Sequence, residues 1–457
     1  MGFSRRQTIY VALQPDQVWD ILTDPGAWLQ FDDQLQQFSP VHMTGNRLQV
    51  ADRVKVVPKA LVRGFVHAAT APPATITTVA ARREIAWRQT QPGGFTQQRW
   101  QLRATVDGGT ELTRHTEVVG PLAAPLGAAL AAPLAGDVGA VGARMVHMAS
   151  TGPDVAQPLT IIAGGSGYLG QRLATRMIAA GQRATVLTRQ PTSGATYPQA
   201  RWGQDDLGPL HELLMDPAGV NIVNLAGKRL GPRFTPEELR LQRASRIVPT
   251  ETLRAAVTAA QEEGAVVHRW IQGSAVPLWG SESTTEFTEA TSPMADTDGP
   301  DGMGRLVTEW EAAAPDNAVF VRTGIVLGQH TEITKGLTAM ARSTTRPSVD
   351  GFLPWIHEDD WVGLVQHLLA MHNAPTKVVA VAPQQTRLSE VIHALVPGQG
   401  PRSIPVPAAL LRTGMNSIGM EPGLLMGSTR ARSIVIDTMG YEFLFPTISS
   451  AGEAVSV

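Results

Sequence analysis

A glycine-rich loop directly follows the apolar segment Leu159–Ala163 and precedes a segment with helical periodicity. Its first glycine allows a tight turn, its second lets backbone N–H groups approach a phosphate, and its third lets the next helix pack closely. The positive end of that helix would stabilise an anion. A purely structural glycine-rich turn is the alternative. We expect a pyrophosphate-binding loop made of Gly164, Gly165, Ser166, Gly167, Tyr168, Leu169 and Gly170.

The next strand-like segment, Ala184–Thr188, ends in a basic residue where NAD-binding proteins place an acid. A carboxylate that binds the ribose is expected about 20 residues beyond the loop. Arg189 stands there, and no acid follows until Asp205. A guanidinium can pair with a 2′-phosphate through two hydrogen bonds. We therefore expect NADP(H) as cofactor, with Arg189 as the selecting residue; a solvated surface arginine is the alternative.

Other polar residues give weaker signals. Glu309 and Glu311 lie on an expected helix, where solvated or salt-bridged glutamates are common. His357 precedes two acidic residues and could orient a substrate phosphate, although a hydrogen-bonded structural histidine is the stronger interpretation. The histidines show no metal-ligand spacing such as H-E-x-x-H, so we expect no metal.

The glycine loop and Arg189 would have to be positioned by alternating strands and helices. The second part of the chain shows the sequence pattern of such an α/β fold. From Leu159 onward, short apolar runs alternate with amphipathic helical segments, which is typical of a doubly wound parallel sheet. The linker preceding it, 151–158, is polar and contains two prolines. The expected strands are Leu159–Ala163, Ala184–Thr188, Asn221–Leu225, Arg269–Gly273, Ala318–Arg322 and Lys377–Val381.

The first 150 residues follow a different order: a strand, a helix, many strands and a closing helix. Asp107-Gly-Gly marks a hairpin between two alternating runs. A curved antiparallel sheet around the closing helix, expected near Pro125–Met148, would leave an apolar groove. The expected strands are Gln7–Leu13, Arg53–Val57, Leu61–His67, Thr75–Val79, Glu84–Gln89, Arg99–Val106 and Glu111–Val118.

Composition excludes several functions. The 457 residues include no cysteine, so disulfides, thiolate metal sites and cysteine nucleophiles are absent. A net charge of −2 argues against nucleic-acid binding. The N-terminus has no apolar region behind its arginines, so it does not resemble a signal peptide. The most apolar stretch, Pro121–Ala135, is shorter than the roughly 20 residues that a membrane-spanning helix needs. Together with the lack of cysteine, this leads us to expect a cytoplasmic protein without a membrane partner.

Several motifs in fixed order resemble the extended short-chain dehydrogenase/reductase family, in its nucleoside-diphosphate-sugar epimerase-like subgroup. They are the G-x-x-G-x-x-G loop, Val223-Asn-Leu-Ala-Gly227, Ser245-Arg246, Ile271-Gln-Gly-Ser274, Trp310-Glu311 and Trp355-Ile-His-Glu-Asp-Asp360. The resemblance implies a Rossmann fold in which Ala226 and Gly227 line the cofactor. It also implies that Ser274 is the catalytic serine.

The family's Tyr-x-x-x-Lys pair does not occur at its expected place. Alignment on Trp310-Glu311 puts Met303 at the tyrosine position and Val307 at the lysine position. Neither side chain can transfer a proton. The subgroup often lacks this pair, so a standard redox mechanism does not follow from the resemblance.

In the first part, Val18-Trp19-Asp20 followed by Thr23-Asp24-Pro25 resembles START-like, or polyketide-cyclase-like, helix-grip domains. Such domains bind hydrophobic small molecules. The alternative is that this domain only packs against its neighbour. We expect a helix-grip domain over 1–150, a linker over 151–158, a Rossmann domain over 159–380 and a small α/β substrate-capping part over 381–457.

Two functions are consistent with these patterns. The first is NADP-dependent oxidoreductase or epimerase chemistry on a small substrate, either a nucleotide-sugar or a carbonyl compound. The second is a non-catalytic protein that responds to NADP(H) and carries a hydrophobic ligand in its first domain.

Overall fold

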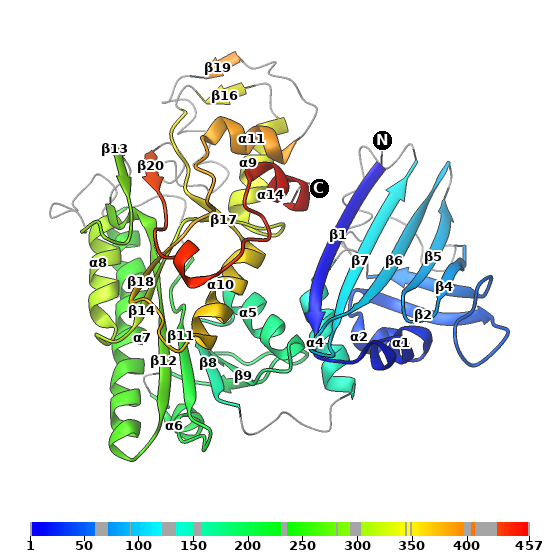
Figure 1. The fold of residues 1–457 in the computed structure, drawn as a ribbon, viewed down its shortest axis with the longest axis horizontal. Helices are drawn as coiled ribbons and strands as arrows, with labels where there is room; N and C mark the ends of the chain where they lie inside the picture. The colour runs from blue at the N-terminus through cyan, green and yellow to red at the C-terminus, as the bar shows by residue number, and fades with distance from the viewer. Residues whose placement is uncertain are drawn as a thin grey trace.

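Two seven-stranded sheets lie side by side in the computed structural model (Figure 1). The structure describes residues 2–455, except 60–71, 92, 121–133, 135, 150–156, 204, 230–234, 280–281, 293–302, 343–344, 348–349, 397–403 and 407–426. The first sheet is antiparallel and the second is parallel, which confirms the expected fold class. The expected linker, 151–158, lies almost entirely outside the described residues.

The first sheet is antiparallel throughout, in the order β1-β7-β6-β5-β4-β3-β2. The hairpin expected at Asp107-Gly-Gly joins β6 to β7, and Gly108 has the positive φ of 86° that such a turn requires. Sequence patterns did not predict β2. The strands are β1 Gly2–Val11, β2 Leu35–His42, β3 Arg53–Pro58, β4 Ala74–Ala80, β5 Glu84–Gln91, β6 Gly94–Ala104 and β7 Thr110–Val119.

Among the described residues of this domain, three helices pack on the sheet: α1 Pro15–Thr23, α2 Trp28–Phe31 and α4 Val138–Ala149. Their shared core is rich in aromatic side chains, with Trp28 stacked on Phe38 at 4.2 Å. The strand expected at 61–67 lies outside the described residues, as does most of the first half of the helix expected at 125–148.

The inward face of the first sheet differs from the apolar surface that we expected. Alternate residues of β7 point inward, and they include Arg114 as well as Leu112. Arg114 is fully buried, with its Nη1 atom 3.7 Å from a carboxylate oxygen of the equally buried Asp32. Gln98 is also buried there. Strand periodicity identifies which residues point inward, but it does not predict that an ion pair replaces apolar side chains.

The second sheet is parallel, in the order β10-β9-β8-β11-β12-β14-β18. The order reverses between β8 and β11, which is where open α/β sheets bind ligands at the carboxyl edge. All six expected strands are present within two residues at each end. The strands are β8 Leu159–Ala163, β9 Ala184–Thr188, β10 Gln199–Arg201, β11 Val220–Asn224, β12 Val267–Ala275, β14 Val319–Thr323 and β18 Lys377–Ala380.

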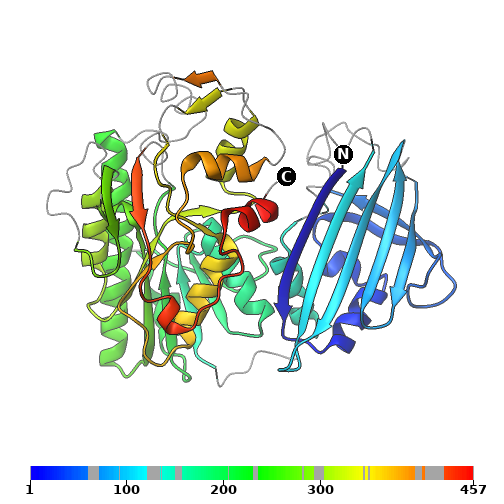
Figure 2. The same ribbon diagram turned by 45° about the horizontal axis from the view of Figure 1, so that its top comes forward.

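Helices cover both faces of the parallel sheet (Figures 1 and 2). Ile162 of β8 packs in the cluster with α5 and α10, while its neighbour Ile161 packs in the cluster with α6 and α7. Successive side chains of a strand point to opposite faces, so an apolar run is buried on both. The helices are α5 Tyr168–Ala179, α6 Gly208–Leu214, α7 Pro236–Glu262, α8 Met303–Ala313 and α10 Glu358–Ala370.

An outer part beyond the carboxyl edge combines segments that are distant in sequence. Each of its three two-stranded sheets is parallel, and the pairs are β13 with β20, β15 with β17 and β16 with β19. Residues after 381 therefore interleave with earlier segments. The elements are β13 Glu282–Phe287, β15 Ile325–Leu327, β16 Thr345–Pro347, β17 Trp355–His357, β19 Ile404–Val406, β20 Ser428–Ala431, α9 Glu332–Arg342, α11 Leu388–Leu395 and α14 Ile448–Val455.

Among the described residues, no helix combines the length and the apolar character that crossing a membrane requires.

Candidate functional site

The glycine loop connects β8 to α5 at the carboxyl edge of the parallel sheet. Gly164 has a φ of 73°, and a Cβ atom there would lie 2.4 Å from the carbonyl oxygen of Leu225. A Cβ on Gly165 would lie 2.6 Å from the side chain of Val186, and one on Gly170 would lie 2.4 Å from the Cα of Gly165. No larger side chain fits at these three positions without moving the backbone or a neighbouring strand.

The loop places the N-terminus of α5 at this edge of the sheet, without a side chain that caps it. Gly167 is the N-cap of α5 and has no side chain to accept hydrogen bonds from the first turn. The first N–H groups of a helix have no partner within the helix, so they remain available to an external acceptor. A glycine cradle beside an uncapped helix N-terminus fits the pyrophosphate of a dinucleotide.

Tyr168 contributes to this loop through its backbone, while its side chain points elsewhere. Its hydroxyl donates to Glu358 at the start of α10. Burial is the main reason that the pKa of Tyr168 is raised, and the nearby Glu358 carboxylate raises it further. The tyrosine hydroxyl is therefore committed to the protein.

Arg189 follows β9 directly, with its side chain exposed to solvent. It forms no ion pair with the rest of the described chain. Arg201, at the end of neighbouring β10, is also exposed, and it pairs in register with Thr188. This corner of the edge is therefore basic and open.

The end of β11 is shaped by a buried amide network that sequence reasoning missed. Asn224 Oδ1 accepts from the backbone N–H of Ala226 at 3.1 Å, and Asn224 Nδ2 donates to Thr250 at 2.8 Å and to Gln272 at 3.0 Å. These bonds fix the turn that carries Ala226 and Gly227. The signal lay in Val223-Asn-Leu-Ala-Gly227, where only the last two residues had been assigned a role.

Arg246 of α7 lies against this turn. A Cβ on Gly227 would lie 3.1 Å from its side chain, and its guanidinium is 5.3 Å from the ring centre of Trp310. Burial lowers the pKa of Arg246 to about 10. A partly desolvated cation beside Gly227 is suited to hold a negatively charged group at the edge of the sheet. The Ser245-Arg246 pair was the available signal.

Ser274 lies near the end of β12 and is nearly buried. Its hydroxyl donates to Glu311 Oε1 of α8 at 2.5 Å. Glu311 in turn accepts from Arg322 Nε and Nη2 at 2.9 and 3.0 Å. The serine proton is thus directed to a carboxylate, and the oxygen lone pairs of Ser274 remain able to accept.

The expected absence of a Tyr-x-x-x-Lys pair at α8 is visible in the packing. Met303 and Val307 are both buried in the interior. Of the four tyrosines, Tyr441 donates its hydroxyl to Asp360 O at 2.8 Å, and Tyr168 donates to Glu358. Neither hydroxyl is free to move a proton beside Ser274.

Two of the weaker candidates, His357 and Glu309, have structural contacts, whereas Glu311 is the hydrogen-bond partner of Ser274. His357 is buried as the N-cap of α10, where its Nδ1 accepts from Asp359 N at 3.1 Å, and burial lowers its pKa. Glu309 pairs with Arg243 and with Arg305, so the salt-bridged interpretation of Glu309 is confirmed. In the described ranges, no group of three or more His, Asp or Glu side chains could hold a metal ion.

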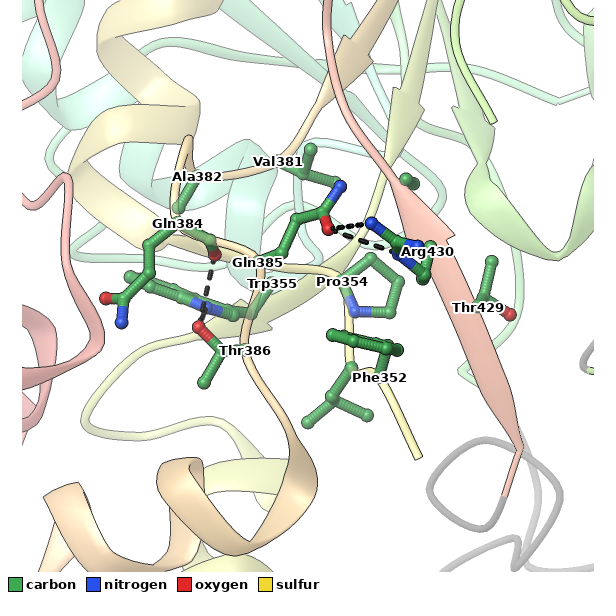
Figure 3. Close-up of a pocket in the computed structure, with 12 residues that line it drawn as sticks. Phe352, Pro354, Trp355, Val381, Ala382, Gln384, Gln385, Thr386, Thr429 and Arg430 are labelled. Atoms are coloured by element: carbon green, nitrogen blue, oxygen red, sulfur yellow. Dashed lines mark hydrogen bonds between the residues drawn. The ribbon is translucent and has the colours of Figure 1, made fainter. Parts of the chain in front are cut away.

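A small pocket, with room for about one water molecule, opens in the outer part between β17, the segment 381–386 and β20 (Figure 3). Arg430 lies across it and donates to Gln385 Oε1 at 3.2 and 3.0 Å. On the other side, Trp355 Nε1 donates to Thr386 at 3.0 Å. Its polar groups are mostly paired with one another.

Comparison with known proteins gives a family match for the first domain and relatives that cover about two thirds of the chain. Residues 3–147 match the family model described as polyketide cyclase/dehydrase and lipid transport.

The human epimerase family protein SDR39U1 is 29% identical over 312 residues, covering 64% of this chain and 97% of that protein. The epimerase family protein YfhF of Bacillus subtilis is 25% identical over 307 residues, with coverages of 63% and 94%.

Solved structures agree with both assignments. The crystal structure of human SDR39U1 isoform 2 with NADPH has a TM-score of 0.53 at 26% identity, covering 65% of this chain and 98% of that one. A nucleoside-diphosphate sugar epimerase from Corynebacterium glutamicum has a TM-score of 0.57 at 18% identity. It covers 99% of this chain, so the fold of both domains recurs there. Both resemblances drawn from the sequence motifs are confirmed.

Proposed function

We propose that this protein binds NADP(H) and catalyses redox or epimerase-type chemistry on a small substrate. This proposal is in line with its similarity to epimerase-family short-chain dehydrogenase/reductases and with its polyketide-cyclase-like first domain. The observation that carries this proposal is the uncapped N-terminus of α5 behind the glycine cradle. The human relative crystallised with NADPH supports the choice of nucleotide.

Each part of the dinucleotide has a candidate partner in this chain. Backbone N–H groups from Gly165 to Leu169 would hold the pyrophosphate, together with the positive end of α5. Arg189 would bind the 2′-phosphate, and Ala226 with Gly227 would line the dinucleotide farther along the edge. When bound, NADP(H) supplies or accepts a hydride.

Ser274 would orient the substrate oxygen. Since its own proton is directed to Glu311, Ser274 Oγ is set to accept a hydrogen bond from a substrate hydroxyl. As the carbon of that hydroxyl gives up a hydride, the substrate proton would pass to Ser274 and the serine proton to Glu311. In the reverse direction Glu311 would return the proton through Ser274. This relay would use no tyrosine.

The test of nucleotide choice is a titration of the protein with NADPH and with NADH, followed by the same titrations on Arg189→Asp. One or two charge-assisted hydrogen bonds are worth about 1.5–3 kcal/mol, so NADPH should bind about 10- to 100-fold more weakly to the variant. Arg103→Asp, an equal charge change on an exposed arginine of the first domain, is the matched control. Unchanged NADPH affinity in Arg189→Asp would refute the role of this residue.

A second function is favoured by the burial of Met303 and Val307 where the family carries its proton-transferring pair. In that case the protein would be a non-catalytic binder that responds to NADP(H) and holds a hydrophobic ligand in its first domain. Turnover distinguishes the two functions. An oxidoreductase consumes bound NADPH when a suitable carbonyl compound is added. An epimerase converts a nucleotide-sugar to its epimer with no net change in the cofactor, and Ser274→Ala slows either reaction. A binder retains NADPH unchanged across the substrate panel.

A further inference from the structure

A buried chain of charged and polar groups crosses the boundary between the two domains and ends at the glycine loop. Arg172 of α5 lies at its centre and is only 8% exposed. Its guanidinium pairs on one side with Asp137, which belongs to the first domain, and on the other side with Glu358 of α10. Glu358 also accepts the hydroxyl of Tyr168, the first residue of α5. We call Asp137, Arg172, Glu358 and Tyr168 the boundary network.

Close helix packing makes this crossing possible. Helix α4 of the first domain lies against α5 of the second (Figure 1). A Cβ on Gly142 would lie 3.2 Å from the Cβ of Ala179, and one on Gly139 would lie 3.3 Å from Thr175 Oγ1. Glycines on α4 therefore bring the two helix backbones together, and Arg172 is buried between them, while the Asp137 side chain is 25% exposed.

The charges in the boundary network depend on one another. Burial alone would lower the pKa of Arg172, but the attraction of Asp137 and Glu358 raises it overall. Removal of one partner from a buried ion pair leaves an uncompensated charge, which is strongly unfavourable. If Asp137 lost its charge, Arg172 would have Glu358 as its main remaining carboxylate. The hydroxyl of Tyr168 donates its hydrogen bond to that same carboxylate.

The network also reaches into the first domain. The inward-facing Arg114 of β7 donates to the carbonyl oxygen of Gly136, the residue before Asp137, and to Gln7 Oε1 at 2.9 Å. Asp137 itself accepts from the N–H of Gly139 at 2.8 Å at the start of α4. A ligand or a movement on the inner face of the first sheet would therefore act on the residue that neutralises Arg172.

We propose that Asp137 and Arg172 are positioning residues for the dinucleotide loop, and that through them the first domain sets the affinity of the second domain for NADP(H). This inference rests on the proposed dinucleotide binding. Tyr168 follows Gly167 directly, so its bond to Glu358 fixes the direction in which α5 begins. Because coupling between two sites is reciprocal, NADP(H) binding would change ligand affinity in the first domain by the same factor.

The test uses Asp137→Asn in the full-length chain, with NADPH as the probe and its fluorescence as the readout. Coupling between sites is commonly worth about five- to 150-fold, and we expect NADPH affinity to fall by about tenfold. Hydrogen exchange at the amides of 165–170 should become faster at the same time. Asp33→Asn is the matched control, because Asp33 pairs with Arg144 inside the first domain alone. It should leave NADPH affinity within about twofold.

Two further variants separate this route from general loosening of the boundary. Arg176 donates to Thr8 O at 3.3 Å across the boundary and pairs with Asp359 of α10, with no bond to Glu358. Arg176→Met should therefore lower the melting temperature while changing NADPH affinity by less than about threefold. Tyr168→Phe removes one hydroxyl and should fold. In that background Asp137→Asn should weaken NADPH binding by less than about threefold, since the link to the loop is already cut.

The outcomes are distinct. If the wild-type protein binds NADPH and folded Asp137→Asn binds it equally well, the inference is overturned and the proposed function stands. The same holds if Asp137→Asn is equally damaging in the Tyr168→Phe background. If Asp137→Asn does not fold, Tyr168→Phe alone decides, and unchanged NADPH affinity and amide exchange there overturn the inference. If the wild-type protein binds neither NADPH nor NADH, both the inference and the proposed function fall.

Discussion

Substitution of Glu311 by glutamine should destabilise the second domain far more than its place on a surface helix suggests. Its carboxylate is 12% exposed and is the ion-pair partner of Arg322, whose side chain is 1% exposed. Glutamine keeps the shape and one acceptor oxygen but removes the charge. Loss of the counter-charge of a buried guanidinium lowers the free energy of unfolding by about 3–5 kcal/mol.

The expected change in melting temperature follows from domain size. An unfolding entropy of about 2.1 cal/mol/K per residue over roughly 300 residues gives about 0.6 kcal/mol/K. The Glu311→Gln variant should therefore melt roughly 5–8 °C lower in a calorimetric scan. Removal of both charges in Glu311→Gln/Arg322→Met should restore most of the loss, since neither charge is then left unpaired.

Glu309→Gln supplies the matched control on the same helix. Its arginine partners are 38% and 57% exposed, so those pairs are screened by solvent and worth about 1 kcal/mol or less. Equal melting temperatures for Glu309→Gln and Glu311→Gln would refute the reasoning. A double variant that is less stable than Glu311→Gln would show that the packing of Arg322 outweighs its charge.

Two other perturbations have defined outcomes. Gly164→Ala should abolish measurable NADPH binding because its Cβ would lie 2.4 Å from Leu225 O. Gly194 has a φ of 86° and open space around it, so Gly194→Ala should lower the free energy of unfolding by only about 1–2 kcal/mol of backbone strain and leave NADPH affinity unchanged. Equal losses of NADPH binding in the two variants would refute the steric argument. Burial lowers the pKa of His357 in the folded protein. Below pH 6.5 the unfolded chain therefore binds a proton at this histidine that the folded chain does not bind. The free energy of unfolding should then fall by up to about 1.4 kcal/mol for each pH unit. His357→Asn keeps an N-cap for α10 and should lose this acid dependence in denaturant titrations; an unchanged slope below pH 6.5 would contradict the assignment.

Sequence patterns predicted the central framework because each buried strand carries its own signal. Ile161 and Ile162 belong to an apolar run long enough for a strand and too short for a helix, and the glycines after it are required by backbone geometry. Strands β13 and β20 carry no such signal. Each exists because the other lies beside it, and they are far apart along the chain.

The polar networks were missed for the same reason. Ser274 and Glu311 are separated by 37 residues, and Asp137 and Arg172 belong to different domains. Local spacing can mark a serine or an arginine as unusual, but it cannot identify a partner that only tertiary folding provides. Arg189 differs from these residues, because its distance along the chain from the glycine loop is enough to suggest a role. That role stays a prediction.

The pairing of β13 with β20 also constrains the order in which the protein is completed during synthesis. A ribosome makes Glu282–Phe287 long before Ser428–Ala431, and until that later segment emerges, β13 has an unpaired edge. A nascent chain that stops near residue 400 would already contain every strand of the central parallel sheet but would lack the partner strand of β13. Such an edge is prone to pairing with other chains, so stalled or truncated products should aggregate even though the central sheet has formed.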